Sequence, residues 1–359
     1  MRRLFKALVM GILLVMIVVG VVPDTAAQDG DVRQIPVTNV LPDSVLSPDG
    51  MTLAVFEWGV VHNDEVIEDY LPIQLVDLET GDVTRLTGPT DYATGAAFSP
   101  DGATLATYHG GGYLWLWDVA TGAVIKKIPA LPGAAKLVYL SDGNLVMQPG
   151  IQPPSLFVWD TATEVVVRVE AHRYASWQAY RESSTGVPDG LSAVAVMPDG
   201  GLLSVSYRSK FWLWPLNGEP PQLVRDSDID LPLFDIRALH VTPDGATVAY
   251  YDRDDEQLHW LDIATGQETL AVPADIISEP GFSADASRAV WVTSDGQLML
   301  WDAAQPDSPT PITLPGLSAD SRAVYREVKV YLTPENQVVL AGFHSPDTGE
   351  NAVVIVDLP

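Results

Sequence analysis

The chain has 359 residues and a net charge of −27, from 20 lysine and arginine residues against 47 aspartate and glutamate residues. This balance argues against nucleic-acid binding, because contact with phosphates requires a basic face, and the absence of cysteine excludes disulfides, thiolate metal sites and a cysteine nucleophile. The 28 glycines, 28 prolines and 10 tryptophans are typical of a turn-rich, all-β protein rather than a helical bundle.

The first 27 residues have the pattern of a secretory signal peptide. Three basic residues precede an uninterrupted apolar run over residues 7–22, which is shorter than the roughly 20 residues that a membrane-spanning helix needs. The small residues Thr25 and Ala27 then occupy the −3 and −1 positions of a cleavage site. We therefore expect a mature chain that begins at Gln28 and is secreted or extracytoplasmic. The alternative is an uncleaved N-terminal anchor.

Two short motifs alternate along the rest of the chain, with seven copies of each. The first is a tight turn of the Pro-Asp-Gly type between two β-like runs, and the second ends an apolar run with Asp, often after Trp. The copies of the first are Ser47–Gly50, Ser99–Gly102, Ser141–Gly143, Pro198–Gly200, Pro243–Gly245, Ser283–Ala286 and Thr333–Asn336, and those of the second are Leu75–Asp77, Leu116–Asp118, Val158–Asp160, Leu213–Pro215, Trp260–Asp262, Leu300–Asp302 and Ile355–Asp357. Each pair of motifs predicts four strands, the content of one β-propeller blade.

The motifs resemble those of the WD40 repeat family and its bacterial propeller relatives. Literal Trp-Asp pairs occur at Trp117-Asp118, Trp159-Asp160 and Trp301-Asp302, and the Pro-Asp-Gly turn is well kept in the first five units. The resemblance implies an all-β, seven-bladed propeller with four-stranded antiparallel blades over residues 28–359. The family's Gly-His before each unit is approached only by Ala171-His172, so the resemblance also implies that the hydrogen-bond network using that histidine is largely missing.

The strand that leads into the second motif is apolar on both of its faces. Trp115 and Trp117 alternate with Leu114 and Leu116, for example. A strand of this kind suits a sheet that is covered on both sides, as when blade packs on blade. We therefore interpret the aromatic strips as core and not as a cofactor site.

The closure of the ring can also be predicted. The seventh unit stops at residues 357–359, before its fourth strand, whereas residues 31–40 precede the first unit and have no other partner. This segment carries the apolar residues Val32, Ile35 and Val37. We expect it to supply the outer strand of the last blade, because full closure removes exposed sheet edges.

The longest connections fall between the second and third strands and between one blade and the next. In a propeller these two sets of loops share one face, and variable loops on a rigid frame are where function usually lies. Residues 171–192 combine aromatic side chains near helical spacing with rare positive charges, so they form our candidate partner-binding segment. A short helix that packs its aromatics on the ring is the alternative. The candidate residues are Arg173, Tyr174, Trp177, Tyr180 and Arg181.

No catalytic residue, cofactor or metal site is predicted. The acidic run Asp252–Glu256 lacks the glycine and distal glutamate of an EF-type calcium loop. His62, His109 and His344 are assigned to loops between second and third strands on one rim, yet they lack a recognised metal-binding spacing. His259 occupies a blade-packing position and is interpreted as structural. Serine-hydrolase elbows, His-Glu-x-x-His pairs and phosphate loops are also absent from the sequence.

These observations predict a monomeric, non-enzymatic scaffold that binds another protein, with no nucleic-acid partner and with membrane contact only through an uncleaved N-terminal segment. Two alternatives remain open. A propeller hydrolase or lactonase would need acidic or histidine side chains that converge on a metal over the central channel. A carbohydrate-binding propeller would need flat, exposed aromatic rings, such as those of Trp177 and Tyr180, that recur in equivalent blade positions.

Overall fold

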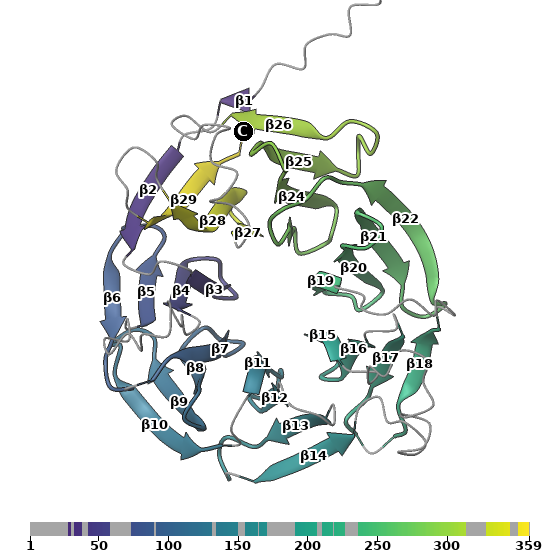
Figure 1. The fold of residues 1–359 in the computed structure, drawn as a ribbon. Helices are drawn as coiled ribbons and strands as arrows, with labels where there is room; N and C mark the ends of the chain where they lie inside the picture. The colour runs from purple at the N-terminus through teal and green to yellow at the C-terminus, as the bar shows by residue number, and fades with distance from the viewer. Residues whose placement is uncertain are drawn as a thin grey trace, which may run out of the picture.

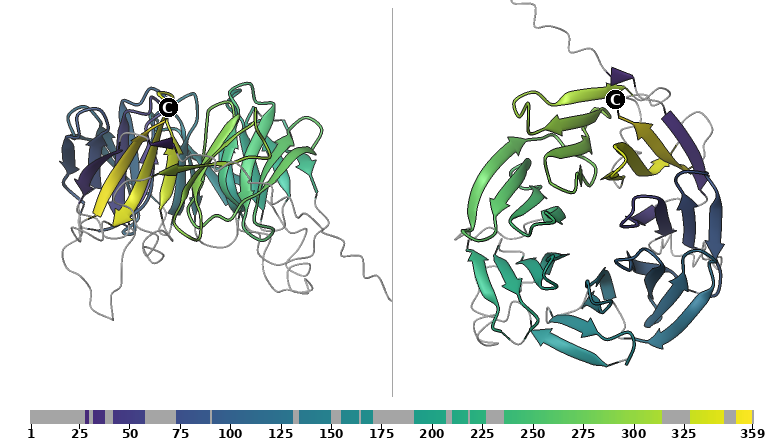
Figure 2. Two further views of the ribbon diagram at one scale, coloured as in Figure 1. Left: turned by 90° about the horizontal axis from the view of Figure 1, so that it is seen from above. Right: turned by 180° about the vertical axis from the view of Figure 1, so that it is seen from behind.

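The computed structural model describes residues 28–29, 32–37, 42–57, 73–89, 91–130, 134–149, 155–163, 165–170, 191–206, 210–217, 219–226, 236–313, 328–344 and 351–358. These residues form seven sheets arranged around a central axis, so the predicted seven-bladed β-propeller is confirmed (Figure 1). The strands of each blade run between the two faces of the ring (Figure 2). Within the described ranges there is no helix of sufficient length and apolar character to span a membrane.

In blades one to five the strands follow one another in sequence from the central axis to the outside (Figure 1). Blades one to three contain β3 (Pro42–Leu46), β4 (Thr52–Glu57), β5 (Ile73–Asp77) and β6 (Val83–Leu86); β7 (Ala93–Phe98), β8 (Thr104–His109), β9 (Tyr113–Asp118) and β10 (Val124–Pro129); and β11 (Ala134–Tyr139), β12 (Leu145–Pro149), β13 (Ser155–Trp159) and β14 (Val166–Glu170). Blades four and five contain β15 (Leu191–Val196), β16 (Leu202–Ser206), β17 (Phe211–Trp214) and β18 (Gln222–Arg225); and β19 (Ile236–Val241), β20 (Thr247–Asp252), β21 (Gln257–Asp262) and β22 (Gln267–Pro273).

Blades six and seven are the two to which the N-terminal strands contribute. Blade six contains β23 (Gly281–Phe282), β24 (Arg288–Val292), β25 (Leu298–Asp302) and β26 (Thr310–Thr313), and β1 (Gln28–Asp29) extends it by pairing parallel to β26. Blade seven contains β27 (Lys329–Leu332), β28 (Gln337–His344), β29 (Asn351–Asp357) and β2 (Val32–Val37). The fifth strand of blade six was not foreseen, because two residues carry no periodic pattern.

Ring closure occurs as the sequence predicts. Strand β2 pairs antiparallel with β29, from Val32 opposite Val356 to Val37 opposite Asn351, and so provides the missing outer strand of blade seven. Ile35 and Val37 are buried in a cluster that also contains Leu53 of blade one. The N-terminal strand therefore joins blades seven and one by packing as well as by hydrogen bonds.

The aromatic strips are core, as predicted. Trp115 and Trp117 of blade two stack with ring centroids 5.6 Å apart and pack against Phe56 of blade one. Trp260 of blade five and Trp301 of blade six lie in one cluster, with centroids 4.5 Å apart. Large rings thus fill the wedges between adjacent blades, where burial of apolar area supplies most of the stabilisation.

The closure strand provides a direct test of this arrangement. We expect Ile35→Ala to lower the free energy of unfolding by about 2–4 kcal/mol, because it removes the buried side chain between blades seven and one and leaves a cavity. The control is Gln34→Ala on the same strand, where the side chain is exposed. Urea denaturation of both variants measures the difference. Equal midpoints for the two would show that β2 is dispensable for the ring.

Candidate functional site

The candidate partner-binding residues Arg173, Tyr174, Trp177, Tyr180 and Arg181 lie outside the described residues. Their place in the chain is nevertheless defined by its flanking strands. Strand β14 ends at Glu170 and β15 begins at Leu191, so the segment connects the outer strand of blade three to the inner strand of blade four. Because consecutive strands run in opposite directions, the end of β14 and the start of β15 lie at the same face as the ends of the second strands and the starts of the third strands. We call this face the loop face.

On the opposite face, the acidic residues of the first motif hold the turns. Ser47 Oγ donates to Asp49 Oδ1 at 2.6 Å, and the Met51 backbone N–H donates to the same oxygen at 3.0 Å. The hydrogen bond from Ser47 is the main reason that the pKa of Asp49 lies below its usual value. The same bond between a hydroxyl and the second residue after it recurs at Ser99–Asp101, Thr242–Asp244 and Ser283–Asp285.

The aspartate that ends the second motif also has a structural role. Asp118 Oδ1 accepts from Thr121 Oγ1 at 2.6 Å and from the Thr121 backbone N–H at 2.8 Å, and these bonds lower the pKa of Asp118. The turn closes at Gly122, whose φ of +67° a side chain would disfavour. Asp77, Asp160 and Asp262 cap their turns through the same backbone contact. Much of the negative charge at this face is therefore used to hold turns in place.

A series of buried hydrogen bonds, which we call the blade-two network, links Trp117, Thr107, His109 and Asp91. Trp117 Nε1 donates to Thr107 Oγ1 at 2.9 Å, Thr107 Oγ1 lies 3.0 Å from His109 Nε2, and His109 Nδ1 lies 3.1 Å from the Asp91 carbonyl oxygen. If Thr107 donates to Nε2, the proton on Nδ1 is left to donate to Asp91. Burial lowers the pKa of His109, which favours this neutral form. His109 is 1% exposed, so its two ring nitrogens, each of which has a hydrogen-bond partner, are out of reach of solvent.

The structure corrects the sequence-based placement of two histidines. His109 and His344 were assigned to loops on the rim, but each is the last residue of a strand, β8 and β28 respectively. His62 and the side chain of His344 lie outside the described residues. The histidine network expected to be largely missing does have an equivalent in blade two, where the second strand supplies the histidine. In blade three, Met147 stands at the register position of Thr107, and Trp159 Nε1 has no partner among the described residues.

A charged cluster lies on the innermost strands, where blades six, seven and one meet. Lys329 Nζ lies 2.6 Å from Asp43 Oδ1 and 3.7 Å from Glu279 Oε2. Burial alone would lower the pKa of Lys329, but Glu279 and Asp43 raise it above its usual value. The ammonium group thus bridges the two carboxylates and ties the inner edge of the closing blades together.

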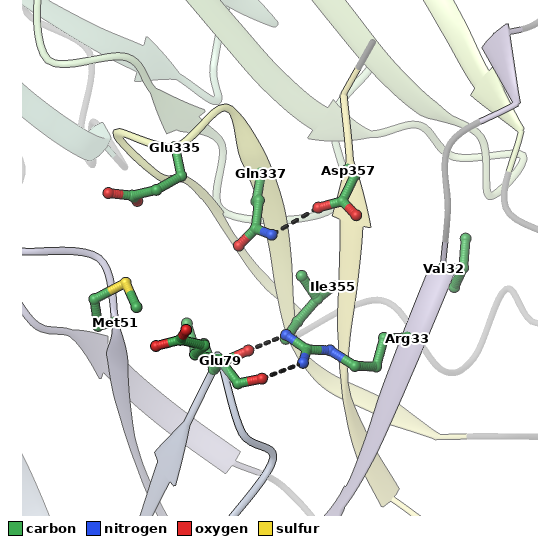
Figure 3. A pocket seen from close by; sticks show the side chains of 9 residues that line it. Val32, Arg33, Met51, Glu79, Glu335, Gln337, Ile355 and Asp357 are labelled. Atoms are coloured by element: carbon green, nitrogen blue, oxygen red, sulfur yellow. Dashed lines mark hydrogen bonds between the residues drawn. The ribbon is translucent and has the colours of Figure 1, made fainter.

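A cavity of about 530 Å³ opens at the closure seam between blades seven and one. Arg33 of β2 donates to the backbone carbonyls of Leu78 and Glu79, and Gln337 Nε2 donates to Asp357 Oδ1 at 2.6 Å (Figure 3). The carboxylates of Glu79, Glu335 and Asp357 leave the lining negative, which suits an ammonium or guanidinium group. Sequence reasoning missed this cavity because three segments far apart in the chain form it. Its lining residues are Val32, Arg33, Met51, Leu78, Glu79, Glu335, Gln337, Ile355 and Asp357.

The acidic run Asp252–Glu256 forms the turn between β20 and β21 on the loop face. Its first residue, Asp252, is the last residue of β20; it is 6% exposed and accepts a hydrogen bond from the Asp254 backbone N–H. His259 lies in the following strand, next to this turn, and contacts Asp255 and Glu268. The sequence analysis treated the run and the histidine as separate features, whereas the structure brings them together.

Comparison with known proteins places the fold but not the function. No protein-family model and no curated protein matches the sequence. The fold is similar to that of the Cps50 (Swd1) β-propeller domain of Myceliophteria thermophila, with a TM-score of 0.66 and 16% identity, covering 92% of this chain and 100% of that one. The WD40-like propeller fold that the motifs imply is therefore supported by structure as well as by sequence.

The blade-two network of hydrogen bonds leads to a prediction about stability. We expect Thr107→Val to lower the free energy of unfolding by about 1–3 kcal/mol, because it leaves Trp117 Nε1 and His109 Nε2 buried without a partner. Thr84→Val on the exposed outer strand β6 is the matched control and should change stability by less than about 0.5 kcal/mol. Thermal or urea unfolding measures both. An unchanged free energy of unfolding in Thr107→Val would mean that the hydrogen bonds of the blade-two network do not stabilise the propeller.

Proposed function

We propose that this chain is an extracytoplasmic, non-enzymatic scaffold that binds another protein through its loop face. The observation that supports this proposal best is the closed ring of seven blades, whose fold is that of WD40-like propellers. Such a ring is a rigid frame on which loops of different length form a broad recognition surface. The proposed location outside the cytoplasm rests on the N-terminal segment, which precedes the described residues.

The recognition segment that we propose is 171–192. It combines Trp177 and Tyr180, two side-chain types that are enriched in binding hot spots, with Arg173 and Arg181 in a chain that is otherwise strongly acidic. Aromatic and arginine anchors of this kind bury large areas and make several hydrogen bonds. The scaffold is proposed to act as a monomer.

The two alternative functions have less support among the described residues. Asp43 of the innermost strand β3 and Glu279, just before the innermost strand β23, contact Lys329 and so do not form the metal site that a propeller hydrolase would need at that point. The exposed aromatic rings within the described ranges, Tyr92 and Tyr113, are both in blade two. They do not recur from blade to blade, as a carbohydrate-binding propeller would require.

The proposal predicts that Trp177→Ala combined with Tyr180→Ala weakens partner binding at least tenfold, because truncation of a buried interface anchor costs about 2 kcal/mol or more. The control is Ile125→Ala, which removes an exposed apolar side chain from the outer strand β10. The measurement is chemical crosslinking in the extracytoplasmic fraction, followed by affinity measurement with the captured protein. Crosslinks should map to 171–192. A partner that binds both variants equally would refute the assignment of this segment.

A further inference from the structure

A buried histidine and two carboxylates meet at the loop-face end of blade five. Asp252 is the last residue of β20, Asp255 lies in the turn, and His259 lies in β21. One side-chain ligand atom from each of the three lies within 4.8 Å of the others. Ligands of a single ion at bond lengths of about 2.0–2.2 Å lie at most about 4.4 Å apart, so small side-chain rotations would bring these three groups onto one ion. The three groups are therefore close enough to share one ion.

The orientation of His259 is set by groups outside this triad. Its Nδ1 lies 2.9 Å from Glu268 Oε2 of the neighbouring strand β22, and its ring stacks on Tyr250 with centroids 5.0 Å apart and planes 15° apart. With the Nδ1 proton donated to Glu268, the Nε2 lone pair is aimed at Asp255 Oδ2, 3.0 Å away. Two electron-rich atoms at this distance require a proton or a metal ion between them. A carboxylate behind the far nitrogen is the usual support of a metal-bound histidine.

The charge around the triad also favours a cation. Asp252 is largely removed from water, with 6% of its surface exposed. Arg253, Asp254, Asp255 and Glu256 follow in the same turn, with three carboxylates against one guanidinium, and Glu268 lies behind the histidine. Arg225 approaches Glu268 only to 3.7 Å. A bound divalent ion would neutralise the buried carboxylate and its neighbours at once.

We propose that Asp252, Asp255 and His259 bind one divalent transition-metal ion, of which Zn²⁺ is the best representative, with Glu268 orienting the histidine. One imidazole and two carboxylates suit Zn²⁺, whereas Ca²⁺ prefers oxygen ligands alone. Three protein ligands leave one position of a tetrahedral ion open to water or to a group from a partner. The site joins three strands of blade five, away from the innermost strand, so it differs from the axial metal that a propeller hydrolase would carry.

The test uses the untagged chain, stripped of metal with a chelator and then titrated with ZnCl₂. Native mass spectrometry should show one zinc ion per chain, and calorimetry should give a dissociation constant that Asp255→Asn raises at least tenfold. Asp255 is chosen because its side chain is exposed, so its substitution should leave folding intact. Unfolding curves in chelator should therefore coincide for the wild type and this variant.

The matched control is Asp254→Asn, which removes the same charge from the same turn but from a residue outside the ligand set. It should keep the wild-type affinity for zinc, because only its backbone N–H contacts the site. The proposal fails if the chain retains no zinc, if CaCl₂ binds more tightly than ZnCl₂, or if the two variants have equal affinities. If both variants bind zinc as tightly as the wild type, any bound zinc must lie on other histidines. If both lose affinity equally, the loss reflects the change in net charge and not the removal of a ligand.

Discussion

A ring of packed sheets is stable only when its first and last blades are joined, because a single open seam would expose two blade faces and a strand edge. In this chain the first and last blades are joined by the pairing of β2 with β29, in which the N-terminal segment supplies the outer strand of the last blade. The same strand buries Ile35 against blade one and sends Arg33 to the carbonyls of residues 78 and 79. Strand β1 extends the contact to blade six, and Lys329 ties the inner edge of the same region.

The closed ring explains where the acidic residues lie. Strands that are buried on both sides have no place for unpaired charges, so many of the carboxylates are at the ends of strands. On the short-turn face they accept hydrogen bonds from hydroxyls and backbone N–H groups, as Asp49 and Asp118 do. The loop face differs, because its connections are longer and carry chemistry that does not repeat from blade to blade. This division is the physical reason for placing recognition on the loop face.

The blade count and the closure strand could be predicted from sequence because both rest on periodic features. The turn motifs recur at regular intervals. The last blade lacks an outer strand, and the N-terminal segment has the alternating apolar residues of a strand, so the pairing of β2 with β29 could be inferred. The direction in which an individual side chain points leaves no periodic pattern in the sequence. Nothing in the sequence distinguishes His109 at the end of a strand from a histidine in a rim loop, and nothing places His259 beside Asp252. The seam cavity was equally hidden, since Arg33, Glu79 and Asp357 meet only when the ring closes.

The two buried histidines show how the surroundings decide what a side chain can do. His109 lies between a threonine hydroxyl and Asp91, whose carbonyl oxygen is 3.1 Å and whose carboxylate oxygen is 3.3 Å from Nδ1, so Nε2 accepts, Nδ1 donates, and the neutral ring needs no further partner. His259 lies between the carboxylates of Asp255 and Glu268, so both nitrogens face acceptors and the surplus must be balanced by a positive charge. A proton can supply that charge, but a proton leaves the buried carboxylate of Asp252 unneutralised. A divalent ion satisfies all three groups, which is why the histidine of blade five and not that of blade two is the candidate ligand.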